Sequence, residues 1–114
     1  SDLAVIVKNV ENAAQFYRDV FEFVDKKRLT ASVSQHRGAW FQLGQLELHL
    51  QERAETDTPK SEQHFALLTE KFDELVQRTR LHGGRVEEAK LIEGISRRCF
   101  LYDPDENRIE LLQK

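Results

Sequence analysis

The stretch Phe100-Leu-Tyr-Asp-Pro-Asp-Glu-Asn-Arg-Ile-Glu-Leu-Leu-Gln113 contains the pattern that decides the fold. Apolar residues on both sides of a polar segment at 103–107 predict two strands joined by a turn. Glu110 is a single carboxylate between Ile109 and Leu111. Because a carboxylate in a strand either sits in water or has a partner, this pattern predicts a solvent-exposed charge or a partner elsewhere in the chain.

Composition limits the class of protein. The chain has 114 residues, 39% of them hydrophobic and 32% charged, which predicts a single globular domain over 1–114. The net charge of −3 and the lack of a basic cluster argue against nucleic-acid binding. No apolar run is long enough to cross a membrane. One cysteine excludes an internal disulfide and fits a cytoplasmic location. The chain has no methionine, so Ser1 is not expected to be the translated start.

Hydrophobic periodicity predicts the same order of elements twice: a strand, an amphipathic helix and three further strands. In the first half these elements are expected at 3–7, 10–21, 29–33, 39–43 and 46–51. In the second half they are expected at 64–68, 72–79, 85–92, 96–102 and 108–112. The polar segment 52–62 contains Pro59 and few apolar residues, which is typical of a linker. The expected modules are therefore 1–51 and 63–114.

The repeat brings four polar residues into equivalent positions. Superposing the first strands of the two halves places His64 on Asp2, and superposing the last strands places Glu110 on His49. Alternation along the last strands points His49 and Glu110 away from their apolar neighbours, toward a polar-lined cup.

Hairpin pairing adds wall residues to this predicted cup. A two-residue turn at 44–45 would set Trp40 opposite His49. Pairing across the turn at 103–107 would set Phe100 near Glu110. In that position, both aromatic side chains are candidates for contact with a ligand, although an aromatic beside a sheet is more often part of the packing.

In this order, the segments 16–23, 46–50, 64–66, 83–84 and 102–111 resemble the vicinal oxygen chelate superfamily. That superfamily includes glyoxalases, extradiol dioxygenases, fosfomycin-resistance enzymes, an acyl-CoA epimerase and bleomycin-resistance proteins. The resemblance covers nearly the whole chain. It implies an α+β fold of two tandem βαβββ modules, which form a curved mixed sheet around a cup-shaped cavity.

The resemblance also implies metal ligands. His64 and Glu110 match the family's His and Glu positions, and His49 matches a last-strand position where some members place a ligand. Asp2 stands where metal-dependent members usually have His, and its side chain is shorter. The implied cofactor is a divalent ion, Zn, Ni, Fe, Mn or Mg, acting as a Lewis acid on substrate oxygens. Glu47 is the candidate catalytic base, and Asp2 is an alternative.

Two departures from the family pattern concern the backbone. Glu22 and Glu106 stand where the helix end and the final turn usually have Gly. For the final turn, Asn107 is expected to supply the left-handed residue instead.

Other polar residues have plainer expected roles. Arg97 and Arg98 would either meet an anionic substrate or form an exposed strand end. His36 and His82 are expected at the surface, and Cys99 is expected to be buried and inert.

Three functions remain open at this point. The first is a metal-dependent enzyme of the isomerase, lyase, transferase or dioxygenase type that acts on a small molecule. The second is a metal-free protein that binds a metabolite or sequesters a drug, as bleomycin-resistance relatives do. The third is a regulatory sensor. The resemblance implies a homodimer, with the cup built either within one chain or by exchange of modules between chains.

Overall fold

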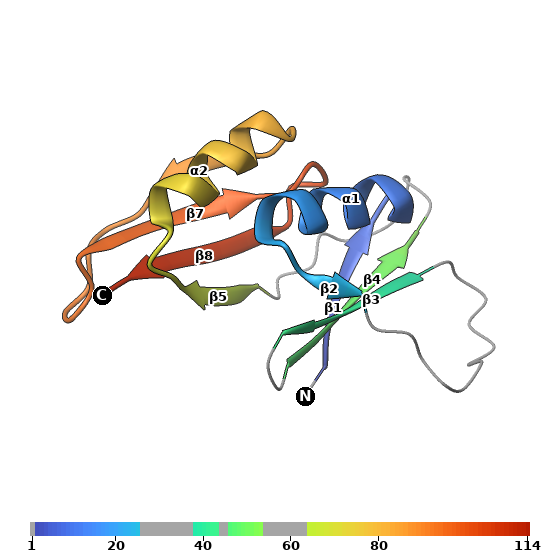
Figure 1. Cartoon of the computed structure of the whole chain (residues 1–114), viewed down its shortest axis with the longest axis horizontal. Helices are drawn as coiled ribbons and strands as arrows, with labels where there is room; N and C mark the ends of the chain where they lie inside the picture. The colour runs from blue at the N-terminus through green and yellow to red at the C-terminus, as the bar shows by residue number, and fades with distance from the viewer. Residues whose placement is uncertain (1, 26–37, 44–45, 54–63) are drawn as a thin grey trace.

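The computed structural model describes residues 2–25, 38–43, 46–53 and 64–114, and it has the predicted element order twice (Figure 1). The first module consists of β1 Asp2–Val7, α1 Val10–Phe21, β2 Val24–Asp25, β3 Gly38–Leu43 and β4 Leu46–Glu52. The second consists of β5 Phe65–Leu68, α2 Phe72–Leu81, β6 Arg85–Glu88, β7 Arg97–Tyr102 and β8 Arg108–Gln113. The α+β fold of two βαβββ modules is therefore confirmed.

Each module forms a four-stranded mixed sheet. The strand orders are β1-β4-β3-β2 and β5-β8-β7-β6, so in both sheets the first strand of the module pairs with its last. That pairing is parallel in both cases, and the other neighbours are antiparallel. The helix between the first and second strands lies over one face of the sheet, and α1 and α2 lie on the same side of the molecule (Figure 1).

The strand registers confirm the repeat at the level of single residues. His49 in β4 lies between Ala4 of β1 and Trp40 of β3. Glu110 in β8 lies between Ala66 of β5 and Phe100 of β7. The predicted cross-strand pairs Trp40–His49 and Phe100–Glu110 are therefore confirmed, and His49 and Glu110 occupy equivalent places in their sheets.

The helices follow from their apolar spacing and their ends. Asn9 caps α1 by accepting a 3.0 Å hydrogen bond from the backbone N–H of Asn12. The helix then ends at Phe21, as predicted. α2 runs to Leu81, two residues beyond the predicted end, and Gly83 follows with φ of 90°. The buried faces carry Val10, Ala13, Ala14, Phe16, Tyr17 and Val20 in α1, and Phe72, Leu75 and Thr79 in α2.

A buried polar contact joins the two modules. The Tyr17 hydroxyl donates a 2.8 Å hydrogen bond to Oδ2 of Asp103, and the Asn107 side-chain amide donates to the carbonyl of Ile6 at 2.9 Å. Asn107 also donates to Asp103 from its side chain and its backbone. Burial raises the pKa of Asp103, and these hydrogen bonds oppose that rise. The turn between β7 and β8 is thereby fixed against β1 and α1.

The same turn corrects one prediction about the backbone. Glu106, with φ of 67°, is the left-handed residue there, and Asn107 is not. Asn107 is instead held by Asp103, whose Oδ1 accepts its backbone N–H at 2.9 Å. Glu22, with φ of 58°, ends α1 in the same left-handed conformation. Both positions where the family usually has Gly therefore need the conformation that Gly adopts most easily.

Several predictions fall on other parts of the chain. The edge strand at 29–33, the turn at 44–45, His36 and most of the linker lie outside the described residues. The strand predicted at 85–92 is shorter and ends at Glu88.

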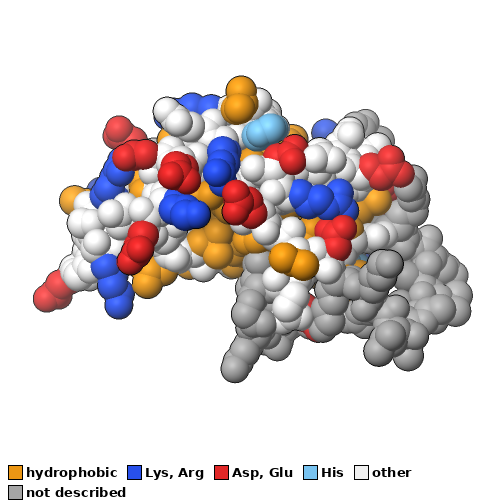
Figure 2. Space-filling model, viewed as in Figure 1, with side chains coloured by type: hydrophobic (Ala, Val, Ile, Leu, Met, Phe, Trp, Pro, Cys, Tyr) orange, Lys and Arg blue, Asp and Glu red, His pale blue; other side chains and the backbone are white. Residues whose placement is uncertain are grey.

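Charged side chains of both signs are interleaved on the face seen in Figure 2. In the portion of the chain that the structure describes, neither helix has the length and apolar character to span a membrane.

Candidate functional site

Glu110 lies on the face of the second sheet that points away from the helices. Its neighbours Ile109 and Leu111 are fully buried under α2, whereas the Glu110 side chain is 16% exposed on the opposite face. The alternation predicted for this strand therefore holds, and the carboxylate is largely withdrawn from solvent. At that degree of burial its charge needs partners.

His64 provides one of these partners. It directly precedes β5, which runs parallel to β8, and Ala66 lies beside Glu110. His64 is two residues before Ala66 and shares its sheet face. Its Nε2 lies 4.0 Å from Oε1 of Glu110, and its side chain is 37% exposed. The structure thus brings together two of the four predicted ligands.

Arg98 provides the second partner, and the sequence analysis missed it. Its Nε donates a 2.7 Å hydrogen bond to Oε2 of Glu110, and one terminal nitrogen donates to the carbonyl of Lys90 at 2.9 Å. The Arg98 side chain is only 19% exposed, so its description as part of an exposed strand end is wrong. The alternation of side chains along β7 could have predicted this contact. Arg98 is two residues before Phe100, which places it on the same face, diagonal to Glu110.

His49 lies on the other sheet with partners of its own. Its ring stacks on Trp40 with centroids 3.6 Å apart and planes 10° from parallel, and Nδ1 lies 3.2 Å from Nε2 of Gln51. Gly38 makes room for this arrangement, because a Cβ there would lie 2.9 Å from Nε2 of His49. Trp40, a candidate for contact with a ligand, thus packs against the imidazole of His49.

The remaining predicted residues of the first module lie near His49 along the strands. Asp2 is the first residue of β1, in register with Glu47 of β4, and Ala4 is in register with His49. Glu47 is half-buried two residues from His49. The first module thus carries Asp2, Glu47 and His49 on adjoining strands, as the second module carries His64 and Glu110.

The predicted ligands whose side chains the structure describes, His49, His64 and Glu110, do not form one three-ligand cluster within a chain. Among the residues that the structure describes, no three His, Cys, Asp or Glu side chains are arranged to hold a metal ion together. His82 is exposed, as predicted, and its Nδ1 lies 3.7 Å from Oδ2 of Asp19. It belongs to neither group.

Two arginine side chains lie close to the ring of Phe100, the aromatic residue predicted to line the cup in the second sheet. The guanidinium carbons of Arg98 and Arg108 lie 5.1 and 4.8 Å from the centroid of the Phe100 ring. Arg97 instead pairs with Asp73 at 2.7 Å and lies over Phe72 on the helix side. The sheet face around Glu110 therefore combines a carboxylate, an imidazole, an aromatic ring and two guanidinium groups.

Cys99 precedes Phe100 and points to the opposite face. It is buried, as predicted, and burial raises the pKa of its thiol to about 11. Because the thiolate is the nucleophilic form, Cys99 is not suited to act as a nucleophile.

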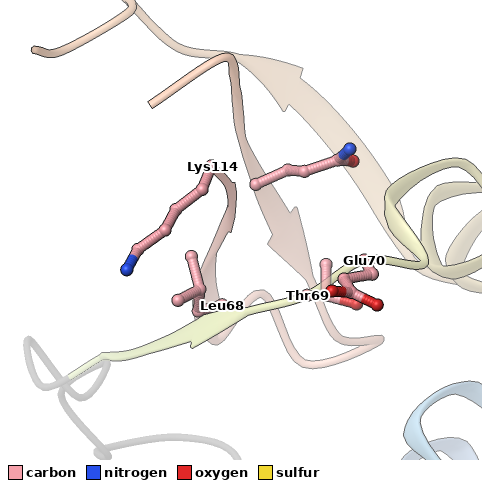
Figure 3. Close-up of a pocket in the computed structure, with 5 residues that line it drawn as sticks. Leu68, Thr69, Glu70 and Lys114 are labelled. Carbon is pink, nitrogen blue, oxygen red and sulfur yellow. The ribbon is translucent and has the colours of Figure 1, made fainter. Parts of the chain in front are cut away.

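A pocket of about 570 Å³ lies at the other end of β5 from His64, where β5 and β8 finish (Figure 3). It is lined by Leu68, Thr69, Glu70, Gln113 and Lys114. None of the predicted site residues lines it, so this pocket is separate from the His64–Glu110 pair.

Solved structures with the same fold include several fosfomycin resistance proteins. A glyoxalase family protein from Bacillus anthracis is 23% identical with a TM-score of 0.78, over 100% of this chain and 93% of that one. A mutant of the fosfomycin resistance protein FosX from Listeria monocytogenes, complexed with Mn(II) and 1S,2S-dihydroxypropylphosphonic acid, is 21% identical with a TM-score of 0.78. That match covers 99% of this chain and 89% of that one. FosX from Mesorhizobium loti is 21% identical with a TM-score of 0.71, over 98% and 88%.

No curated protein sequence matches the chain. One family model does match, over residues 2–111. The chain therefore belongs to the glyoxalase/bleomycin resistance protein/dioxygenase superfamily.

Proposed function

We propose that the protein is a small-molecule enzyme that uses a divalent metal ion, of the isomerase, lyase or dioxygenase type, with His64 and Glu110 as metal ligands. The observation that carries this proposal is the 4.0 Å approach of His64 Nε2 to Glu110 Oε1 on the sheet face that points away from α2, where the Glu110 side chain is only 16% exposed. The fold is shared with a protein crystallised with Mn(II), which supports the choice of a metal that accepts nitrogen and oxygen ligands.

The donor pair fits a divalent ion in type. Imidazole nitrogen and carboxylate oxygen bind such ions at about 2.1 Å, so the two side chains would have to approach from 4.0 Å by roughly 0.5–1 Å to bind one ion at a tetrahedral or octahedral angle. When bound, the metal would supply Lewis-acid polarisation of substrate oxygens. His64 and Glu110 provide only two donors, which leaves positions for substrate and for further protein ligands.

The equivalent half of the site, Asp2 and His49, is proposed to complete it from a second chain. The two modules carry these residues in matching registers, yet the described ligands of one chain form no cluster of three. Exchange of modules in a homodimer would set the first module of one subunit against the second module of its partner. This arrangement makes the dimer a requirement for the full ligand set.

Other residues have assigned roles in this proposal. Glu47 is the proposed catalytic base, because it shares a strand face with His49, two residues away. Asp2 is the alternative base if it is not a ligand. Trp40 and Phe100 form the walls beside His49 and Glu110.

Mn²⁺ binding to the intact protein tests the ligand assignment. We expect His64→Ala and Glu110→Gln to weaken binding by at least about tenfold, measured from the electron paramagnetic resonance signal of free Mn²⁺. His82→Ala is the matched control, since His82 pairs with Asp19 outside the site, and it should leave the affinity unchanged. Wild-type protein that binds no Mn²⁺, or equal affinities in all variants, would contradict the assignment.

Subunit mixing tests where the second half of the site comes from. His49→Ala and His64→Ala are prepared separately, each with weakened Mn²⁺ binding, and then unfolded and refolded together. If the site spans two chains, a mixed dimer holds one site with both histidines intact, so wild-type affinity returns for part of the sample. If each site lies within one chain, mixing restores nothing.

The alternative function is a metal-free binding protein, and one contact favours it. Glu110 is already paired with Arg98 at 2.7 Å, so its charge is balanced without a metal ion. Elemental analysis of protein purified without chelator separates the two functions. A stoichiometric metal that is lost in His64→Ala favours the enzyme, and a metal content at background in both proteins favours the binding protein.

A further inference from the structure

We propose that Arg98 competes with a divalent cation for Glu110, so that the Arg98–Glu110 ion pair sets the affinity of the metal site. This inference rests on the proposed function, because it concerns the same carboxylate. It assigns a regulatory role to a residue that is not itself a metal ligand.

The contacts of Arg98 show how firmly it holds Glu110. Its Nε donates to Oε2 of Glu110 at 2.7 Å, and a terminal nitrogen donates to the carbonyl of Lys90 at 2.9 Å. Its guanidinium carbon lies 5.1 Å from the centroid of the Phe100 ring. A carboxylate, a backbone carbonyl and an aromatic face therefore fix one side chain. The other carboxylate oxygen, Oε1, is directed toward His64.

The charge of Arg98 determines whether it raises or lowers the affinity of Glu110 for a divalent ion. A guanidinium cannot lose its proton in a protein, so Arg98 remains a cation beside Glu110. The pair is formally neutral, and the two side chains are only 19% and 16% exposed, which limits screening by solvent. A divalent ion bound to Glu110 would face a fixed like charge across the same carboxylate. Because both cations draw on the charge of one carboxylate, a divalent ion bound to Oε1 weakens the hydrogen bond that Arg98 donates to Oε2.

The hydrogen bond from Arg98 could instead position Glu110 for metal binding, and this alternative predicts the opposite change in affinity. Carboxylate ligands are commonly held by outer hydrogen-bond donors, and removal of such a donor weakens metal binding about 10- to 100-fold. A merely positioning Arg98 therefore predicts weaker binding when its side chain is removed. A competing Arg98 predicts tighter binding, so the direction of the change separates the two roles.

The experiment compares Mn²⁺ affinities of Arg98→Gln, Arg98→Ala and wild-type protein by the same titration. We expect both variants to bind Mn²⁺ at least about tenfold more tightly, because the charge of Glu110 is no longer shared with a guanidinium and no hydrogen bond to a charged group has to be weakened. The added substitution Glu110→Gln should abolish this gain. Arg97→Gln is the matched control: it removes the same charge from the adjacent residue, whose guanidinium pairs with Asp73, and it should not change the affinity appreciably.

A second measurement follows Arg98 itself. In nitrogen-15 spectra of the wild-type protein, addition of diamagnetic Zn²⁺ should shift the Arg98 Nε–H signal and speed its exchange with water as the pair with Glu110 opens. An unchanged Arg98 signal at saturating Zn²⁺ would overturn the proposal.

The outcomes for the two proposals are distinct. If wild type and Arg98→Gln both bind Mn²⁺ and the variant binds equally or more weakly, only the competition fails. If neither protein binds Mn²⁺, the metal-dependent function fails as well. If only Arg98→Gln binds Mn²⁺, the competition holds, and the failure of the wild-type protein to bind contradicts the proposed function.

Discussion

The Tyr17 hydroxyl donates a 2.8 Å hydrogen bond to Asp103, so a helix of the first module is tied to a turn of the second. Both residues are buried. Tyr17→Phe removes one donor from a buried carboxylate, and we expect it to lower the free energy of unfolding by about 1.5–3 kcal/mol. Urea unfolding followed by circular dichroism measures this change. Gln15→Ala, which removes an exposed hydrogen bond to Asp19, should cost less than about 0.5 kcal/mol.

The same hydroxyl predicts a stability change at alkaline pH. Burial, followed by the charge of Asp103, raises the pKa of Tyr17 well above its usual 10.0. Above pH 10 the unfolded chain loses this proton while the folded protein keeps it, so the folded state binds more protons and the free energy of unfolding falls as pH rises. Tyr17→Phe should therefore lose less stability than wild type between pH 10 and about 11. Parallel curves for the two proteins would contradict this prediction.

The buried thiol of Cys99, whose pKa is also raised, allows a prediction about chemical reactivity. Burial raises the pKa of its thiol from 9.0 to about 11, so the folded protein holds almost no thiolate at pH 8. Iodoacetamide should label Cys99 slowly in the folded protein and rapidly in urea, as read by mass spectrometry. A labelling rate that is equal in both conditions would mean that the thiol is accessible in the folded state.

Glu22 offers a route to higher stability. It ends α1 in a left-handed conformation with φ of 58°, which a residue with a Cβ adopts at a cost of roughly 1 kcal/mol. Glu22→Gly should raise the free energy of unfolding by about 0.5–1 kcal/mol. Glu22→Ala is the control, because it also removes the ion pair with Arg78 but keeps the Cβ. A gain in Glu22→Ala as large as in Glu22→Gly would show that the carboxylate, and not the backbone, causes the strain.

Alternation and the repeat were enough to predict most of the fold. Apolar residues on both sides of His49 and Glu110 indicated the faces of β4 and β8. Pairing across the two-residue turn predicted at 44–45 and the longer turn at 103–107 indicated their partners Trp40 and Phe100. The 29–33 strand had only weak alternation to support it, and the true end of the 85–92 strand at Glu88 was not marked by any break in pattern.

The candidate site was harder to predict than the fold, because side-chain pairing depends on diagonal neighbours as well as direct ones. Arg98 was missed as a partner of Glu110, because hairpin pairing points to the residue directly opposite, Phe100, whereas Arg98 lies diagonally across the two strands. Asn107 was assigned the left-handed conformation from its residue type. The hydrogen bonds that Asp103 accepts in the turn give that conformation to Glu106 instead.

The Arg98–Glu110 pair also makes a prediction about stability that is independent of any metal ion. Both side chains are largely buried, so removal of one partner leaves an uncompensated charge. We expect Arg98→Gln and Glu110→Gln each to destabilise the metal-free protein, and the double variant to be more stable than the sum of the two losses implies. The coupling energy from this double-mutant cycle should be about 1–3 kcal/mol.

The exposed pair of Arg97 and Asp73 provides the matched comparison for this cycle. Its atoms are as close, 2.7 Å apart, but both side chains are open to solvent, which screens the interaction. Its coupling energy should therefore be clearly smaller and should fall further in high salt, whereas that of Arg98 and Glu110 should change little. Equal coupling energies in the two cycles, measured by urea unfolding in chelator-treated buffer, would mean that Glu110 is not held by Arg98 in solution.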